Sequence, residues 1–149
     1  MAIWQYTIEM IPKEDLDIIG DNIGTEAYNK FNFWQAGGGY TSEYFTPITK
    51  LLPMGESWSK NIKLYGNEDS TCIKLIVENN KIAEVIIRLD FRNDYSKLLS
   101  EIVEFCSFNS LLLLDEEQNI LPLNETGIGY QIKSSPQYIR LQKLSNKTD

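Results

Sequence analysis

Between Thr71 and Arg92 apolar and polar side chains alternate with a period of two, on either side of a pair of asparagines. A period of two is the signature of a β-strand with one buried face. On the first segment the apolar face consists of Thr71, Ile73, Leu75 and Val77. On the second it consists of Ala83, Val85, Ile87, Leu89 and Phe91, with Glu84, Arg88, Asp90 and Arg92 opposite. The pattern predicts an antiparallel hairpin over about residues 71–92.

The parity of these positions constrains the turn of the hairpin. Directly paired residues of an antiparallel ladder lie on the same face, so odd positions must oppose odd positions. This excludes a two-residue turn at Asn79-Asn80 and favours a three-residue loop such as 78–80, with Asn80 in the left-handed conformation. A slip of one residue would bury Arg88 and Asp90, so the register is well specified.

The N-terminal part of the chain is less regular. Residues 3–10 alternate as a half-buried strand does, and Pro12 suits the first turn of a helix that Gly20 would end. The segment 27–34 fits either a helix or a strand. Other expectations are an edge strand over 40–48, ended by Pro47, and a stretch over 51–58 whose apolar residues, including Trp58, pack against the body.

The C-terminal part predicts further helices and strands. A helix begins after Arg92, capped by Asn93 or Asp94. Its apolar stripe comprises Tyr95, Leu98, Leu99, Ile102, Phe105 and Cys106, whereas Lys97, Glu101 and Glu104 face water. Residues 111–114 read as a central strand buried on both faces, and 120–123 as a short strand pairing back. A last helix starts at Ser135-Pro136, and its packing residues are Tyr138, Ile139, Leu141 and Leu144.

The order of these elements predicts one α+β domain over residues 1–149. Its mostly antiparallel sheet contains the hairpin at about 71–92, and the helices pack on one face.

Composition limits the chemistry that we expect. The chain has no histidine, which is the usual general base near neutral pH and the commonest metal ligand. We therefore expect no enzyme, no catalytic residue, no metal and no cofactor. With 14 basic against 21 acidic side chains, the net charge is −7. Like charges repel nucleic acid and anionic membranes, and a basic protein partner is favoured.

Cellular location follows from similar arguments. The chain has no signal-peptide pattern and no apolar run long enough to span a bilayer, so we expect a cytoplasmic protein. Cys72 and Cys106 sit in apolar patterns and are expected to be buried, reduced thiols.

Three groups of polar residues are candidates for partner binding. The first lies on the outward face of the second hairpin strand, where the alternative is a solvated face with ion pairs. The others are two acidic turns, for which ordinary turn chemistry is the alternative. The predicted partner-binding residues are Glu68, Asp69, Glu84, Arg88, Asp90, Asp115, Glu116 and Glu117. Ile76 and Ile86 share the outward face and indicate that it is partly covered.

The stretch from Leu51 to Arg92 resembles small bacterial immunity proteins that are encoded beside secreted or contact-delivered toxins. The matching residues are Leu52, Pro53, Ser57, Trp58, Tyr65, Gly66, Arg88, Asp90 and Arg92. The resemblance implies tight, noncovalent neutralisation of one cognate toxin in the producing cell. The net charge of −7 favours a basic toxin, and we expect a monomer or weak dimer. The resemblance assigns no contact residue.

Two other functions stay open. One is a small-ligand-binding or carboxylate-dependent enzymatic domain that uses the region 21–66, where Trp34 and Tyr40 would line a pocket. The other is a structural subunit of a larger assembly.

Overall fold

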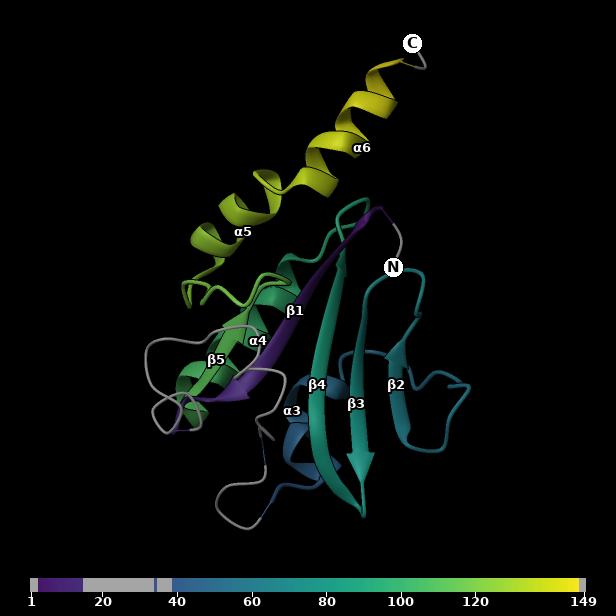
Figure 1. Ribbon diagram of the computed structural model, residues 1–149, viewed down its shortest axis with the longest axis vertical. Helices are drawn as coiled ribbons and strands as arrows, with labels where there is room; N and C mark the ends of the chain where they lie inside the picture. The colour runs from purple at the N-terminus through teal and green to yellow at the C-terminus, as the bar shows by residue number, and fades with distance from the viewer. Residues whose placement is uncertain (1–2, 15–33, 35–38, 148–149) are drawn as a thin grey trace.

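One five-stranded antiparallel sheet forms the centre of the molecule (Figure 1). The computed structural model describes residues 3–14, 34 and 39–147. The strands are β1 (Gln5–Pro12), β2 (Ile62–Gly66), β3 (Cys72–Glu78), β4 (Lys81–Asp90) and β5 (Leu111–Leu114). They lie in the order β2-β3-β4-β1-β5, and each neighbouring pair is antiparallel. The predicted α+β class is confirmed.

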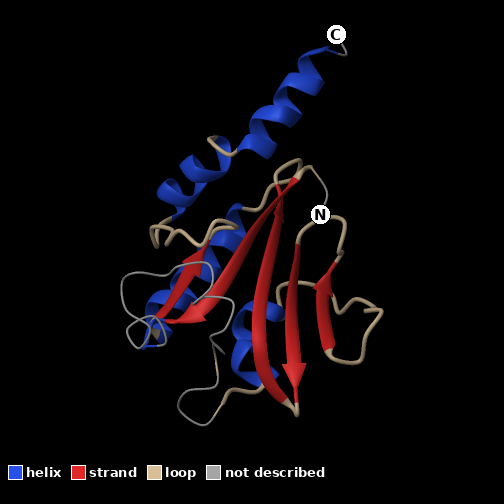
Figure 2. Cartoon of the chain, in the orientation of Figure 1, coloured by secondary structure: helices blue, strands red, loops and turns tan. Residues whose placement is uncertain are grey.

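The described helices gather on one side of this sheet and at one end of it. They are the 3₁₀ helix η2 (Ser42–Phe45), α3 (Thr46–Thr49), α4 (Ser96–Asn109), α5 (Glu125–Lys133) and α6 (Pro136–Lys147). Figure 2 shows α3 and α4 behind the strands, while α5 and α6 lead away past the end of the sheet. None of the helices in the described ranges combines the length and apolar character that crossing a bilayer needs.

The central hairpin is formed by β3 and β4. Ile73 pairs with Ile87 and Leu75 with Val85, so odd positions oppose odd positions as predicted, and all four side chains are buried. The turn, however, is the two-residue Asn79-Asn80 turn that the parity argument excluded. Both asparagines have positive φ, 52° and 65°, which two-residue hairpin turns favour.

A β-bulge explains why the excluded turn exists. The register shifts between Ile76, which pairs with Glu84, and Val77, which pairs with Ile82. Ala83 is the extra residue, so the parity of the pairing changes before the turn. As a consequence Ile82 is fully buried, and Ala83, predicted to face the core, is only half-buried.

The first strand has the predicted length but is shifted by two residues, to Gln5–Pro12 instead of residues 3–10. Residues 11 and 12 continue β1 and pair with Leu112 and Leu111, so Pro12 ends the strand and does not lie in a helix. Residues 13 and 14 are helical, so the helix predicted from Pro12 begins one residue later. Proline is tolerated here because pairing with β4 ends at Met10 and leaves one side of the strand open. The rest of that predicted helix and nearly all of 27–34 lie outside the described residues.

The region before β2 also differs from expectation. The predicted edge strand over 40–48 is wrong, because η2 and α3 occupy it and Pro47 stands in the first turn of α3. On this side of the sheet the edge strand is β2, which the sequence did not predict. Leu51 and Leu52 pack against the core, but Trp58 is 82% exposed.

Helix α4 agrees with its predicted stripe. Five stripe residues are buried and Tyr95 is half-buried against them. The N-cap is Tyr95, without a side-chain cap hydrogen bond, and not the predicted Asn93 or Asp94. Asp94, directly before it, accepts a hydrogen bond from the Ser96 backbone N–H at 2.9 Å. Burial raises the pKa of the Cys106 thiol to about 12, and Cys72 is buried as well, as expected for both.

Strand β5 is buried but not central. It lies at the edge of the sheet beside β1. Its free side is partly closed by the chain that follows, since Leu121 N–H donates to the Leu113 carbonyl at 2.8 Å. The predicted strand over 120–123 is reduced to one bridge between Ile120 and Leu114.

The C-terminal helices were predicted only in part. Helix α5 was missed, since Gly127 and Gly129 weaken its helical signal. Helix α6 starts at Pro136 as predicted, and its Tyr138 packs edge-on against Phe91 at 5.3 Å between ring centroids. Ile139 and Leu144 were expected to pack but are exposed.

Candidate functional site

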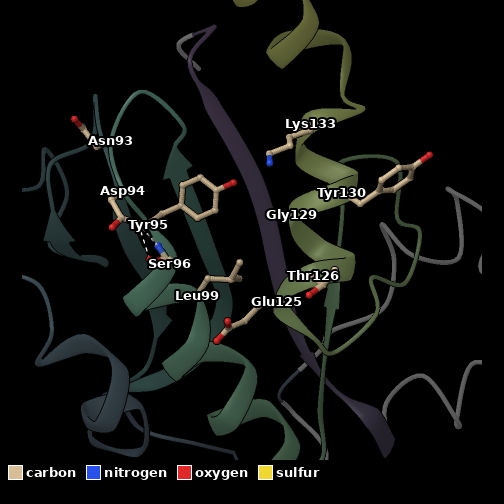
Figure 3. A pocket seen from close by; sticks show the side chains of 10 residues that line it. All are labelled: Asn93, Asp94, Tyr95, Ser96, Leu99, Glu125, Thr126, Gly129, Tyr130 and Lys133. Atoms are coloured by element: carbon tan, nitrogen blue, oxygen red, sulfur yellow. Dashed lines mark hydrogen bonds between the residues drawn. The ribbon is translucent and has the colours of Figure 1, made fainter.

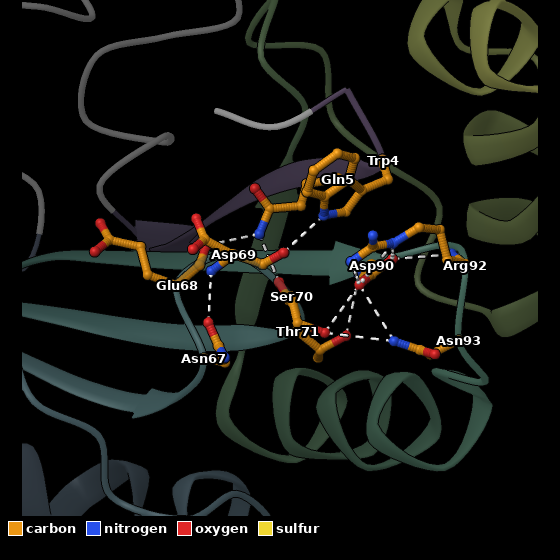
Figure 4. A network of polar contacts seen from close by, with 10 residues as sticks. All are labelled: Trp4, Gln5, Asn67, Glu68, Asp69, Ser70, Thr71, Asp90, Arg92 and Asn93. Atoms are coloured by element: carbon orange, nitrogen blue, oxygen red, sulfur yellow. Dashed lines mark hydrogen bonds and ion pairs between the residues drawn. The ribbon is translucent and has the colours of Figure 1, made fainter. Parts of the chain in front are cut away.

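A network of polar side chains ties together one corner of the sheet (Figure 4). At its centre Asp90, the last residue of β4, is fully buried. Arg92 Nη2 donates to Asp90 Oδ2 at 2.7 Å and Arg92 Nε donates to Oδ1 at 3.0 Å. The Ser70 hydroxyl and the Asn93 amide also donate to Oδ2, at 2.9 and 3.2 Å. Both carboxylate oxygens are therefore satisfied within the protein.

This arrangement corrects the prediction that Asp90 faces outward into solvent. The loop between β2 and β3 covers it: Ser70 bonds its side chain, and Thr71 Oγ1 accepts its backbone N–H at 3.0 Å. Burial by itself would raise the pKa of Asp90, but the hydrogen bonds from Arg92 and Ser70 outweigh it and lower that pKa. The carboxylate stays ionised and has a structural role at this corner.

The acidic turn at residues 67–70 is held in place by the start of β1. Trp4 Nε1 donates to the Asp69 carbonyl at 2.6 Å. Gln5 Nε2 donates to the carbonyls of Glu68 and Ser70 at 2.8 and 2.6 Å. The Arg92 guanidinium lies 4.0 Å over the Trp4 ring. The turn is thus fixed through its backbone, which its sequence did not indicate.

On the neighbouring outward face Glu68 makes ion pairs. Lys74 Nζ lies 2.6 Å from Glu68 Oε1, and Arg88 Nη1 lies 3.9 Å from the same atom. The hydrogen bond from Lys74 lowers the pKa of Glu68 against a smaller effect of burial. Arg88 Nε is buried and has no hydrogen-bond partner among the described residues. Four of the predicted residues, Glu68, Asp69, Arg88 and Asp90, thus lie at this corner, mainly in intramolecular contacts.

Glu84 lies apart from them, nearer the hairpin turn and beside Glu9 of β1. Burial and the charge of Glu84 raise the pKa of Glu9 to about 7. Burial and Glu78 also raise the pKa of Glu84. Ile76 and Ile86 on this face are half-buried, in agreement with a partly covered face.

Glu9→Gln is expected to stabilise the protein by about 1–2 kcal/mol near pH 8, after allowance for the partial exposure of the carboxyl. The folded state holds the Glu9 proton more tightly than the unfolded state does. Ionisation therefore costs stability above the folded pKa, and this cost disappears as the pH falls to the unfolded value of 4.5. Urea unfolding of both proteins at several pH values measures the effect. Glu14→Gln, at an exposed site, is the control. If Glu9→Gln stabilised the protein equally at low pH, the raised pKa of Glu9 would be contradicted.

The second acidic turn follows β5. Asp115 Oδ1 accepts the backbone N–H groups of Glu117 and Asn119, both at 2.9 Å, so Asp115 shapes the turn. Glu116 and Glu117 are exposed. A polar pocket of about 340 Å³ lies beside them, lined by Tyr6, Asp115, Glu116, Glu117, Asn119, Gln131, Ser134, Ser135, Pro136 and Gln137.

A groove of about 580 Å³ lies between the start of α4 and α5 (Figure 3). Glu125 and Lys133 extend from α5 toward α4, and Tyr130 points away from the groove. Tyr95 and Leu99 form the α4 side. Asp94 at its margin accepts hydrogen bonds from Ser96 but keeps its charge, so the groove lining carries two carboxylates, Asp94 and Glu125, and one ammonium group, Lys133.

A smaller groove of about 400 Å³ lies between α3 and α4. Its lining comprises Tyr44, Pro47, Ile48, Glu101, Glu104, Phe105, Phe108 and Asn109. Phe108 is 86% exposed. The sequence analysis missed Phe108, although a signal existed: its spacing of seven and four from Glu101 and Glu104 places it on their water-facing side of α4.

Two aromatic residues that could have lined a ligand pocket belong to the core. Trp34 is fully buried, and Tyr40 is half-buried with its ring centroid 5.3 Å from that of Trp34. Within the described part of 21–66, this packing speaks against the ligand-binding alternative. The described ranges also contain no group of three Cys, Asp or Glu side chains that could hold a metal ion.

Comparison of the chain with protein-family models, curated proteins and solved structures finds no match.

Proposed function

We propose that this protein binds and neutralises a basic partner protein, as an immunity protein does for a cognate bacterial toxin in the cytoplasm of the producing cell. The observation that carries the proposal is the exposed Phe108 beside an apolar groove, with carboxylates on the same helix face.

Phe108 has the character of an interface anchor. Aromatic side chains dominate binding energy when a partner removes them from water. The groove beside Phe108 has an apolar wall formed by Tyr44, Ile48 and Phe105, so an apolar side chain of the partner finds a matching surface there. Burial of an exposed phenylalanine also removes an unfavourable contact with solvent.

The charges around the groove indicate which partner fits. Glu101 and Glu104 stand on the same face of α4 as Phe108, and the whole chain has a net charge of −7. An acidic rim around an apolar centre favours a partner whose apolar anchor is flanked by lysine or arginine. Opposite charges accelerate association and select against acidic proteins.

Phe108→Ala is expected to weaken binding to the proposed toxin partner, to be sought among the products of neighbouring genes, about 30-fold, the loss typical of a hot-spot aromatic. Since Phe108 is exposed, the thermal midpoint of the protein should stay unchanged. Isothermal titration calorimetry measures the affinity, and Trp58→Ala, at an exposed tryptophan outside the groove, is the matched control. Wild-type affinity in Phe108→Ala would refute the proposed interface.

A further inference from the structure

The pocket beside the second acidic turn contains a buried phenol with an unused hydroxyl. Tyr6 is only 6% exposed and lines this pocket. Its hydroxyl makes no hydrogen bond to any residue of the described ranges. Among the described residues, Arg88 Nε is the only fully buried side-chain nitrogen or oxygen atom without a hydrogen-bond partner. Because the Tyr6 hydroxyl also lacks a partner, it cannot be fully buried, and its oxygen is therefore open to the pocket.

The carboxylates of the turn influence this hydroxyl electrostatically. Burial raises the pKa of Tyr6 to about 12, with further contributions from Asp115, Glu116 and Glu117. The phenol thus stays protonated and lies within the field of three negative charges. Asp115 is engaged by its own turn, but Glu116 and Glu117 have no ion pair with any described residue.

The remaining wall supplies neutral hydrogen-bonding groups. Gln131 and Ser134 come from the end of α5, and Gln137 comes from the first turn of α6. No lysine or arginine is among the described lining residues. The pocket therefore presents an excess of acceptors and negative charge, which suits a cation with several donors.

We propose that this pocket binds the guanidinium group of an arginine side chain presented by the partner protein. A guanidinium has five N–H donors in one plane, is weakly hydrated and binds carboxylates in pairs. The phenol oxygen of Tyr6 and the amide oxygens of the wall accept its remaining donors. The source of the arginine rests on the proposed function, whereas the chemistry of the pocket does not.

The test uses the whole protein and the probe Nα-acetyl-arginine amide. Amide chemical shifts measured by NMR should change saturably at residues 115–119 and 131–137. The citrulline analogue, which has nearly the same shape without the charge, should bind about tenfold more weakly. The double variant Glu116→Gln/Glu117→Gln should lose about tenfold in affinity for the arginine probe, and Tyr6→Phe should lose less while keeping the core packing.

The double variant Glu14→Gln/Glu125→Gln, at two exposed sites outside the pocket, is the charge-matched control and should leave probe binding unchanged. Equal binding of the citrulline probe, or equal loss in the control, would overturn the inference and reveal only nonspecific attraction to negative charge. This failure is distinguishable from failure of the proposed function, because partner binding through Phe108 would persist. In the complex, the double variant should also weaken partner binding about tenfold.

Discussion

Trp34→Ala is expected to lower the free energy of unfolding by about 3–5 kcal/mol, the cost of emptying a large aromatic site in a packed core. Trp34 is fully buried, and its ring meets Tyr40 and Phe45 edge-on at centroid distances of 5.3 and 5.2 Å. Its Nε1 donates to the Met10 carbonyl of β1 at 3.1 Å. One side chain thus contributes apolar contact, aromatic geometry and a buried hydrogen bond.

Two variants separate these contributions. Trp34→Phe keeps most of the packing and loses the hydrogen bond, so it should cost less than Trp34→Ala. Its own cost should be about the value of the lost buried hydrogen bond from the ring nitrogen. Trp58→Ala, at an 82% exposed site, should change stability by no more than about 0.5 kcal/mol. Chemical denaturation of the wild type and the three variants measures each change in the free energy of unfolding. Similar losses at positions 34 and 58 would contradict the burial of Trp34.

Asp90→Asn is expected to cost about 3 kcal/mol near neutral pH, because the buried acceptor of Arg92, Ser70 and Asn93 loses its charge. The pH dependence has a definite sign. The folded pKa of Asp90 lies below its unfolded value of 3.8. Its contribution is therefore complete above the unfolded pKa and is lost as the pH falls through the folded pKa. The gap between wild type and Asp90→Asn should narrow in strong acid.

Asp69→Asn is the matched control for this corner. Asp69 lies in the same polar corner, but its side chain is exposed and its structural contact is through the backbone carbonyl. We expect a change within about 0.5 kcal/mol at any pH. Urea unfolding curves between acid and neutral pH compare the three proteins, and a pH-independent gap for Asp90→Asn would refute the role of its charge.

Local periodicity predicted the elements whose neighbours are near in sequence. The alternation over 71–92 and the apolar stripe of α4 are such cases, and both agree with the structure. Periodicity cannot detect one unpaired residue, so the bulge at Ala83 reversed the parity on which the turn prediction depended. Similarly, two glycines concealed α5 because helix propensity is a weak signal against tertiary packing.

The candidate site was harder to predict than the fold. The alternating pattern of β4 places Asp90 on the outward face, so the sequence predicts an exposed side chain. In the structure the loop at 67–70, together with Arg92 and Asn93 after β4, covers it. Of the predicted partner-binding residues, Glu116 and Glu117 remain exposed beside a pocket. Phe108 was missed because sequence periodicity ranks residues by their fit to a core, and Phe108 does not take part in the core.

The position of β1 has a consequence for the order in which the chain assembles. It is the first strand in sequence, yet it lies between β4 and β5 and pairs Gln5 with Asp90 and Pro12 with Leu111. Loop-closure entropy disfavours such distant pairings until closer contacts have formed. During synthesis the β3–β4 hairpin can therefore form early. Strand β1 can pair with β4 only after β4 has left the ribosome. The other edge of β1 then stays uncovered, and open to pairing with other chains, until β5 follows.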